Sequence, residues 1–307
     1  MGDRSSLSLL GGQQELLRRV SAVAKKTIVV LIGGRPLTFE TGSCDAKTGN
    51  VVDLGIPSAT VQDGAAFPWD PSESFGAACS QPSLLANVSG LLAAWRPGAE
   101  GGPALFNLLS GAVNPSAHLS VAWPRSVGGI GSQVPYLQQY ALHYREQYQD
   151  EPTTPLFRFG YGLSYSNITS SAPRVANPNV THSDTIDIAV DITNHSPLAA
   201  TTVLQIYFQQ MKGGAAVIRY YCQLVRFART HIDASATKTV HIQLKIADLS
   251  YWDNDEEGYL GAKGWRLGRP GTRTTYNLMA GLQAPECTGS GGCDLPGVQI
   301  NFDVPTA

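Results

Sequence analysis

The side chains in this chain that could take part in acid–base or metal chemistry occur singly rather than in sets. Glu100, in the segment PGAEGG, follows a predicted strand and precedes a predicted helix. Ligands bind at such turns in α/β sheets, but the surrounding glycines favour a packing turn. The acidic run Asp253–Glu257 lacks the ligand spacing of a calcium loop and is interpreted as a solvated turn.

The remaining motifs that carry chemistry are not found. The six histidines form no HExxH motif, the cysteines form no Cys-x-x-Cys pair, and the chain has neither a Gly-x-Ser-x-Gly elbow nor a phosphate loop. We therefore expect no metal site and no bound cofactor.

The five cysteines and the glycosylation sequons favour secretion. Cys287 and Cys293 enclose a short glycine-rich loop that could close into a disulfide, and Cys44 and Cys79 enclose a long irregular segment that a second disulfide could pin. Cys222 lies in a strand-like run and is predicted to be a buried free thiol. The Asn-x-Ser/Thr sequons, in mild excess over chance, are Asn87, Asn167, Asn179 and Asn194.

The composition limits the class of protein. The chain has 307 residues, 43% of them hydrophobic and 15% charged, with a formal net charge of -2. That length allows two domains, and that charge gives no electrostatic reason to expect a nucleic acid or an anionic membrane as a partner. No apolar run is long enough to span a bilayer, and the first residues lack the pattern of a signal peptide.

The first half of the chain has the pattern of an α/β domain. A helix is predicted over residues 13–26, and a buried strand over Thr27–Ile32, whose β-branched run is typical of a strand covered on both faces. In the segment 91–124, a strand, a helix beginning near Pro103 and a strand over Leu119–Ala122 form a predicted βαβ unit.

Two stretches of the first half do not follow this pattern. Residues 40–84 are rich in glycine, proline, serine and aspartate, and we interpret them as an inserted surface loop, functional or disordered. Tyr136, Tyr140 and Tyr144 fall on one face of a possible helix. They suit packing better than an aromatic platform for a sugar.

The second half alternates apolar and polar residues with period two, in short runs separated by turn residues. Runs such as Ile186–Ile192, Val240–Ile246 and Val298–Phe302 predict a β-sandwich over residues 182–307. A Ser/Pro/Asn-rich stretch over residues 166–181 predicts a linker, which makes residues 1–165 the α/β domain.

The amino-acid sequences of several segments resemble glycoside hydrolase family three, the β-glucosidases and β-xylosidases. DRSSLSLLGGQQELLRRV, WRPGAEGG, LLSGAVNPSAHLS and PLFRFGYGLSY resemble the family's second domain, in the family's order. DIAVDITN, VLQIYFQQ and YNLMAGL resemble its fibronectin type III-like domain. The fold class implied is α/β plus all-β: a partial α/β sandwich domain followed by a fibronectin type III-like β-sandwich.

The resemblance implies a retaining glycosidase that acts on β-linked carbohydrate, extracellular or in the cell wall. Such enzymes need two carboxylates about 5–5.5 Å apart. In the family the nucleophile lies in an upstream TIM barrel, and the acid/base glutamate lies just before the segment matched here by Asp3 and Arg4. Neither carboxylate can be assigned to a position of this chain, so no catalytic residue is named. The chain by itself is expected to be inactive.

Asp3 and Arg4 are the only residues matched beside the family's active-site loop, with loop support or helix capping as their two interpretations. Glu73 is a poor candidate for a replacement acid. The resemblance also implies an upstream barrel domain or a partner chain. The alternative function is a non-catalytic carbohydrate-binding or structural module. Tryptophans could serve either function: packing is expected for Trp95 and Trp123, and exposure for Trp252 and Trp265.

Overall fold

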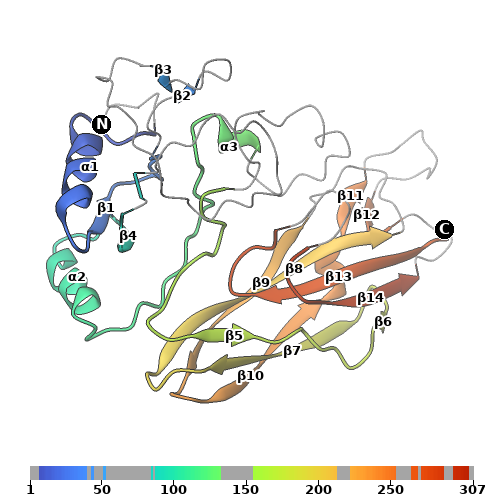
Figure 1. Ribbon diagram of the computed structural model, residues 1–307. Helices are drawn as coiled ribbons and strands as arrows, with labels where there is room; N and C mark the ends of the chain where they lie inside the picture. Colours follow the sequence, from blue (N-terminus) through green and yellow to red (C-terminus); the bar gives the residue numbers. More distant parts are fainter. Residues whose placement is uncertain are drawn as a thin grey trace. The chain divides into compact units, whose positions relative to one another are not determined.

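The computed structural model describes residues 7–39, 43–44, 51–52, 84–85, 87–132, 155–212, 222–253, 264–268, 271–286 and 293–303. Within it the chain forms two compact units (Figure 1). The first comprises Met1–Leu105, Trp123–Gln133 and Glu146–Leu156, and the second comprises Phe106–Ala122, Val134–Arg145 and Phe157–Ala307. Each unit is described by itself.

The first unit is built on one parallel strand pair. Helix α1 (Gln13–Val23) precedes strand β1 (Ile28–Ile32), which pairs in parallel with β4 (Gly90–Trp95), Val29 lying opposite Leu91. Helix α2 (Gly101–Leu109) follows and runs into the second unit. A short helix, α3, covers Gly129–Ser132, and Ser43–Cys44 (β2) pairs with Val51–Val52 (β3). The predicted α/β pattern of this region is confirmed for helix α1 and strands β1 and β4.

The expectation that Thr27–Ile32 is covered on both faces is wrong for the described residues. Ile28 is 52% exposed and Ile32 is 64% exposed, while Leu31 is buried. In the described residues β4 is the only strand that pairs with β1. A β-branched run therefore indicated the strand correctly but not its degree of burial.

Helix α1 carries an apolar stripe that faces outward in this unit. Leu16, Val20 and Val23 follow one another at helical spacing and are 63%, 42% and 86% exposed, whereas Leu17 on another face is buried. Exposed apolar patches of this kind mark surfaces that associate. The stripe is therefore a candidate source of self-association.

We expect Val23→Glu to reduce the self-association of the purified protein, because a charge in the stripe resists burial against another chain. Sedimentation velocity over a concentration series measures the effect. Ala22→Glu is the matched control, since it adds the same charge at an exposed position of the same helix outside the stripe. Equal self-association of wild type and Val23→Glu would show that the stripe is not the contact surface.

The predicted strand over Leu119–Ala122 is not formed, and with it the βαβ unit over residues 91–124. This segment lies in the second unit, where the backbone N–H of Leu119 donates to the Tyr161 carbonyl and that of Gly160 donates to the Leu119 carbonyl. These bonds hold the segment to residues 160–161 without continuing as a ladder. The alternation of Leu119, Val121 and Trp123 is real, but it serves a local contact rather than the parallel sheet.

The second unit is a two-layered β-sandwich (Figure 1). One sheet has the order β6-β14-β13-β8-β9, and the other has the order β10-β7-β5. The strands are β7 (Thr185–Asn194), β8 (Ala200–Lys212), β9 (Gln223–Ile232), β10 (Thr237–Lys245), β13 (Arg273–Gly281) and β14 (Gly297–Asp303). The remaining elements are the 3-10 helix η1 (Ile246–Leu249) and a separate pair, β11 (Tyr251–Asp253) and β12 (Gly264–Arg266).

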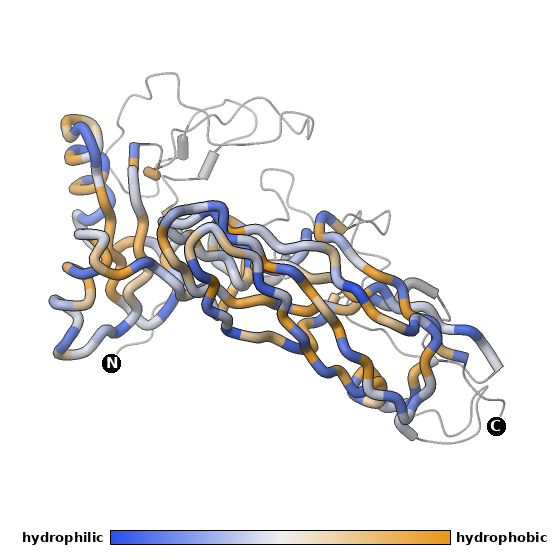
Figure 2. Tube along the Cα trace, turned by 90° about the horizontal axis from the view of Figure 1, so that it is seen from below, coloured by the Kyte–Doolittle hydropathy of each residue, from blue (hydrophilic) through white to orange (hydrophobic). Residues whose placement is uncertain are grey.

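Alternating residues from both sheets form one core. The burial of β7 alternates along its length, with Ile188, Val190 and Ile192 fully buried, and Leu204 and Ile300 complete the same cluster from the facing sheet. The alternation of hydrophobic and hydrophilic residues along these strands can be followed in Figure 2. The period-two pattern of the sequence therefore predicted both the strands and the residues that face inward.

Residues 166–181, predicted to be a linker, contribute two strands to the sandwich. β5 (Ile168–Ser170) pairs antiparallel with β7, and β6 (Asn179–Val180) pairs in parallel with β14. Both are too short to give a detectable alternation, and their serine, proline and asparagine neighbours favour turns. The segment is thus an integral part of the second unit.

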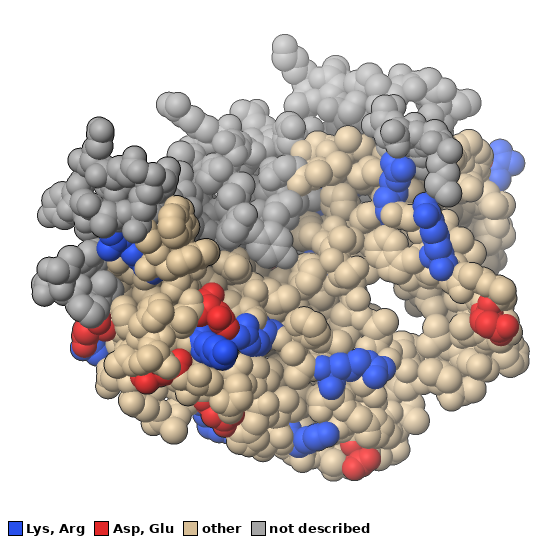
Figure 3. All heavy atoms as spheres, turned by 180° about the vertical axis from the view of Figure 1, so that it is seen from behind, with Lys and Arg blue, Asp and Glu red and all other residues tan. Residues whose placement is uncertain are grey.

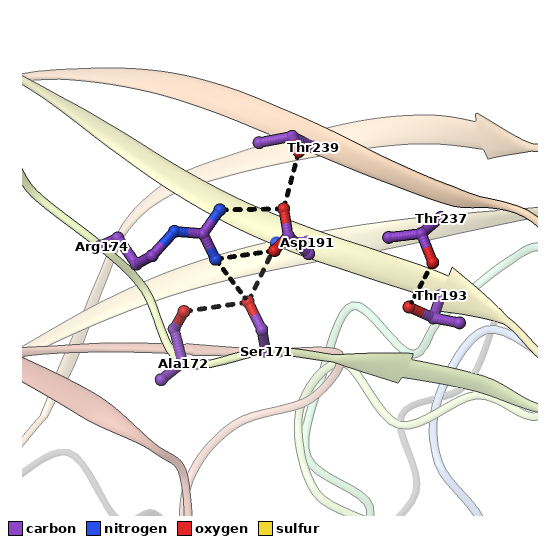
Figure 4. A network of polar contacts seen from close by, with 7 residues as sticks. All are labelled: Ser171, Ala172, Arg174, Asp191, Thr193, Thr237 and Thr239. Atoms are coloured by element: carbon purple, nitrogen blue, oxygen red, sulfur yellow. Dashed lines mark hydrogen bonds and ion pairs between the residues drawn. The ribbon is translucent and has the colours of Figure 1, made fainter.

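A polar network fixes this segment to β7 (Figure 4). Both Nη atoms of Arg174 bond to the carboxylate of Asp191, at 2.7 and 2.9 Å, and Thr239 on β10 donates to the same carboxylate at 2.7 Å. The bonds from Arg174, and next from Thr239, lower the pKa of Asp191 to about 2. The network therefore stabilises the fold only while Asp191 is ionised.

This gives a pH-dependent prediction. Because the folded-state pKa lies below the ordinary value of about 3.9, the stabilisation is complete above pH 4 and is lost as the pH falls toward 2. We expect Arg174→Ala to lower the thermal midpoint at pH 7 and to flatten its decline between about pH 4 and 2. Lys245→Ala, an exposed cation on β10, is the control that should leave this slope unchanged. A slope identical in wild type and Arg174→Ala would contradict the assignment.

Candidate functional site

The carboxyl ends of β1 and β4 form the one edge in the first unit where an α/β sheet would be expected to hold a ligand. The backbone N–H of Gly33 donates to the Trp95 carbonyl at 2.9 Å and joins the two strand ends. Trp95 has a φ of 51°, a left-handed conformation that is strained for a bulky residue. A Cβ added at Gly34 would lie 2.7 Å from Nη2 of Arg96, so glycine lets this guanidinium lie over the turn.

Two tryptophans pack behind this edge. The rings of Trp95 and Trp123 are 6.0 Å apart at 52°, Trp123 is 3% exposed, and its indole N–H donates to the Leu37 carbonyl at 2.8 Å. A ring whose donor is satisfied inside the protein and whose faces are covered is not available to a sugar. The expectation that Trp123 packs inside the unit is confirmed, and its strand-end partner Trp95 contacts it.

The described acids of the first unit are Glu15 and Glu100. Glu15 bonds to Arg18 and Arg19 at 2.7 and 2.5 Å, and these bonds lower its pKa to about 2, which makes it a poor proton donor. Glu100 is an exposed residue in the turn before α2. Among the described residues this unit therefore offers no carboxylate pair at the separation required for retaining glycoside hydrolysis.

Several sequence candidates lie outside the described residues. They are Asp3, Arg4, Glu73, Cys79, Cys287 and the three tyrosines Tyr136, Tyr140 and Tyr144. The backbone of Cys44 lies in β2, but its candidate disulfide partner Cys79 is among these residues.

Among the described residues no group of three or more histidine, cysteine or acidic side chains could hold a metal ion. None of the described helices has the length and apolar character needed to cross a bilayer.

Asn114 lies in the segment Phe106–Ala122, which belongs to the second unit, and its side chain makes four hydrogen bonds there. Its Nδ2 donates to Ser166 Oγ at 2.9 Å and to the Ala199 carbonyl at 3.0 Å. Its Oδ1 accepts from Ser164 Oγ at 2.8 Å and from the Tyr165 backbone N–H at 2.9 Å. Both donors and both acceptor positions of the amide are used. One side chain thus connects residues 164–166 to the start of β8.

His118 and two glycines continue this connection. The imidazole of His118 bonds to the Gly160 carbonyl at 2.6 Å and to Thr202 Oγ1 at 3.1 Å. Gly160 has a φ of 77°, and a Cβ there would lie 2.2 Å from the amide of Gln205. A Cβ at Gly162 would lie 2.6 Å from the Ala117 carbonyl. The segment FGYGLSY therefore requires glycine at both positions because the backbone lies directly against its neighbours.

Arg158 anchors the same segment to the end of the sandwich. Its guanidinium forms ion pairs with Glu286 and with Asp294, the latter at 2.5 Å, and Asp294 also accepts the backbone N–H of Glu286 at 2.7 Å. One arginine holds both carboxylates in ion pairs, which suits a structural clamp rather than acid–base catalysis. Sequence reasoning missed Asn114, His118 and Arg158, although all three stand inside the quoted segments LLSGAVNPSAHLS and PLFRFGYGLSY.

Cysteine and asparagine candidates in the second unit have distinct environments. Cys222 is a buried free thiol, and burial raises its pKa to about 12. Cys293 is disulfide-bonded, while its pairing with Cys287 stays a prediction. Asn194 is 1% exposed, and its Nδ2 donates to the Leu198 and Asp233 carbonyls, at 2.8 and 3.1 Å. This geometry argues against a glycan on Asn194 in the folded domain.

The other described sequons remain open to modification. Asn87, Asn167 and Asn179 are exposed.

The surface of the described residues carries scattered cations and anions rather than one basic face, as Figure 3 shows for one side of the molecule.

The arrangement of elements matches known proteins. The C-terminal domain model of glycosyl hydrolase family 3 matches residues 75–165, and a fibronectin type III-like domain model matches residues 202–267. Residues 75–165 belong to the C-terminal domain of glycosyl hydrolase family 3. The sequence resemblance to this family is thereby confirmed, as is the fold class of α/β plus all-β.

The relatives that match this chain include longer glycosidases. A β-xylosidase from Formosa agariphila is 30% identical over 256 residues, which is 83% of this chain and 29% of the relative. A periplasmic β-glucosidase from Salmonella typhimurium is 27% identical over 81% of this chain and 28% of the relative. The chain therefore spans less than a third of the length of these two relatives.

Solved structures share the fold. A β-glucosidase from Listeria innocua in complex with glucose superposes with a TM-score of 0.70 at 22% identity, over all of this chain and 35% of that one. A β-glucosidase from Erythrobacter marinus gives a TM-score of 0.69 at 26% identity, over 98% of this chain and 31% of that one. Both units of the family 3 region thus have counterparts in a single known enzyme chain.

Proposed function

We propose that this family 3 chain is the C-terminal scaffold of a β-glycosidase that hydrolyses O-glycosyl bonds of β-xylosides or β-glucosides. The observation that carries the proposal is the match of both its regions, in order, to β-xylosidases and β-glucosidases. The contacts of Asn114, His118 and Arg158 support a bracing role, because they fix family segments to the sandwich with satisfied polar bonds.

The division of labour follows from the resemblance to the family. It implies that the nucleophile and the acid/base group come from other polypeptide, an upstream barrel domain or a partner chain, and the described carboxylates of the first unit, Glu15 and Glu100, do not form a retaining pair. Asp3 and Arg4 would support the loop that carries the acid/base glutamate. The substrate is then held mainly by the barrel, and this chain keeps the second domain in place against it.

We also propose that the working protein is extracellular or in the cell wall. The exposed sequons Asn87, Asn167 and Asn179 and the disulfide-bonded Cys293 support an oxidising, secretory environment. Mass spectrometry of secreted protein before and after glycan removal would test this. Unmodified asparagines and a free Cys293 thiol in secreted material would contradict it.

A chimera tests the catalytic proposal. The region of the Formosa agariphila β-xylosidase that aligns with this chain is replaced by residues 1–307, and the product is assayed with aryl β-xyloside. We expect hydrolysis well above that of the same β-xylosidase cut before the exchanged region. A second chimera with the Salmonella typhimurium β-glucosidase guards against a mismatch with one host. Two folded, monodisperse chimeras that are both inactive would contradict the proposed function.

A further inference from the structure

Two tryptophans project together from the small β11–β12 sheet of the second unit. Trp252 and Trp265 lie directly opposite each other across the strands and are 50% and 68% exposed. Their ring centroids are 5.6 Å apart, and their planes meet at 75°. In this edge-to-face arrangement the edge of one ring lies against a face of the other ring. The first ring therefore has both faces uncovered by its partner, and the second ring has one face uncovered.

The strands that carry the two tryptophans are held by buried residues. Tyr251, directly before Trp252, is only 8% exposed, and Leu267, directly after β12, is 2% exposed and belongs to the sandwich core. The hydroxyl of Tyr276 on β13 donates to the Leu267 carbonyl, and η1, just before β11, is buried through Ile246 and Leu249. Because the strands are held in this way, a ligand would not have to order the two rings on binding.

The size of the patch discriminates between classes of ligand. Each tryptophan presents 150–250 Å² when fully open, so the pair offers roughly 200–300 Å² of apolar surface. A stable protein interface needs about 800 Å² from each partner. The pair is therefore too small for a protein partner of ordinary size, but it suits one or two pyranose rings, whose C–H faces are apolar and whose rims are polar.

We propose that Trp252 and Trp265 form a binding site for a β-1,4-linked xylo-oligosaccharide. The choice of carbohydrate rests on the proposed function. Each indole takes the C–H face of one pyranose, and its N–H is available to a sugar hydroxyl. Because the planes are nearly perpendicular, the site fits a chain whose successive rings are twisted relative to one another, as in xylan. A flat glucan ribbon presents coplanar faces and fits less well.

Affinity gel electrophoresis of the full chain tests the proposal, with soluble β-1,4-xylan or soluble β-1,4-glucan in the gel. We expect xylan to retard the wild-type protein more than glucan does. Trp252→Ala and Trp265→Ala should each weaken binding about tenfold, and Trp265→Phe should recover part of the loss. Phe227→Ala is the matched control, since this residue on β9 is an aromatic of 69% exposure and should leave the retardation unchanged.

Circular dichroism confirms that each variant is folded before binding is compared. Unretarded, folded wild-type protein would overturn the proposal, and so would tryptophan variants that bind xylan as wild type does. Stronger retardation by glucan would overturn the choice of a twisted chain. If the tryptophan variants self-associate less than wild type and xylan retards none of the proteins, the pair is a protein-docking surface and the proposal is overturned. The assay requires no hydrolysis, so its outcome is independent of the activity of the chimeras.

Discussion

Purified protein of this sequence is expected to hydrolyse aryl β-xyloside and aryl β-glucoside at rates orders of magnitude below an ordinary enzyme, whose turnover is about 10 per second. The reason is that no catalytic carboxylate of the family is matched in this chain, and the described acids of the first unit are unsuitable: Glu15 is held by two arginines, and Glu100 is exposed in a turn. Loss of one member of a cooperating catalytic set costs several powers of ten.

The control for this measurement is the active chimera, assayed at equal concentration with the same substrates. Glu100→Gln in the isolated chain provides a second check, because any residual rate should be unaffected by it. A turnover near that of an ordinary glycosidase, abolished by Glu100→Gln, would show that the chain has its own catalytic acid.

Substitution of Asn114 by alanine is expected to lower the free energy of unfolding of the second unit by about 2–4 kcal/mol. The side chain makes four hydrogen bonds, each contributing about 0.5–1.5 kcal/mol net. The loss also leaves Ser166 Oγ and the Ala199 carbonyl without this donor in a half-buried site. Urea unfolding of the full chain, followed by circular dichroism, measures the change.

Two further variants make the result specific. Asn114→Asp keeps the acceptor for Ser164 and Tyr165 but replaces the donor to Ser166 and Ala199, so it should be destabilising as well. Asn167→Ala makes the same truncation at an exposed position and should change the stability by less than about 0.5 kcal/mol. Equal stability of Asn114→Ala and Asn167→Ala would refute a central role for the amide.

The sequence was most informative where burial is periodic. Ile188, Val190 and Ile192 alternate with partly exposed residues because one face of β7 is in the core and the other is turned toward solvent. Helix α1 was predicted from apolar residues at helical spacing, of which Leu17 is buried while Leu16, Val20 and Val23 are exposed, so the spacing indicated the helix but not its buried face. The exposure of Trp252 and Trp265 was expected from their position beside a loop and is confirmed.

The sequence was least informative where a segment is fixed by a few polar bonds. β5 and β6 have three and two residues, too few to show a period. The role of Asn114 depends on Ala199, which is far along the chain, so no local pattern reveals it. Asn194 illustrates the same limit, because a sequon does not reveal that its amide is buried and bonded.

The polar bonds of Asn114 and His118 bear on how such proteins can be recombined in evolution. A crossover at residue 165, between the two matched domain models, would separate Asn114 from Ser166 and Ala199, and His118 from Thr202. A sandwich inherited from another lineage would then have to supply the same acceptors at the same places. We therefore expect residues 106–122 and 157–303 to be inherited as one block, with tolerated crossovers upstream of it.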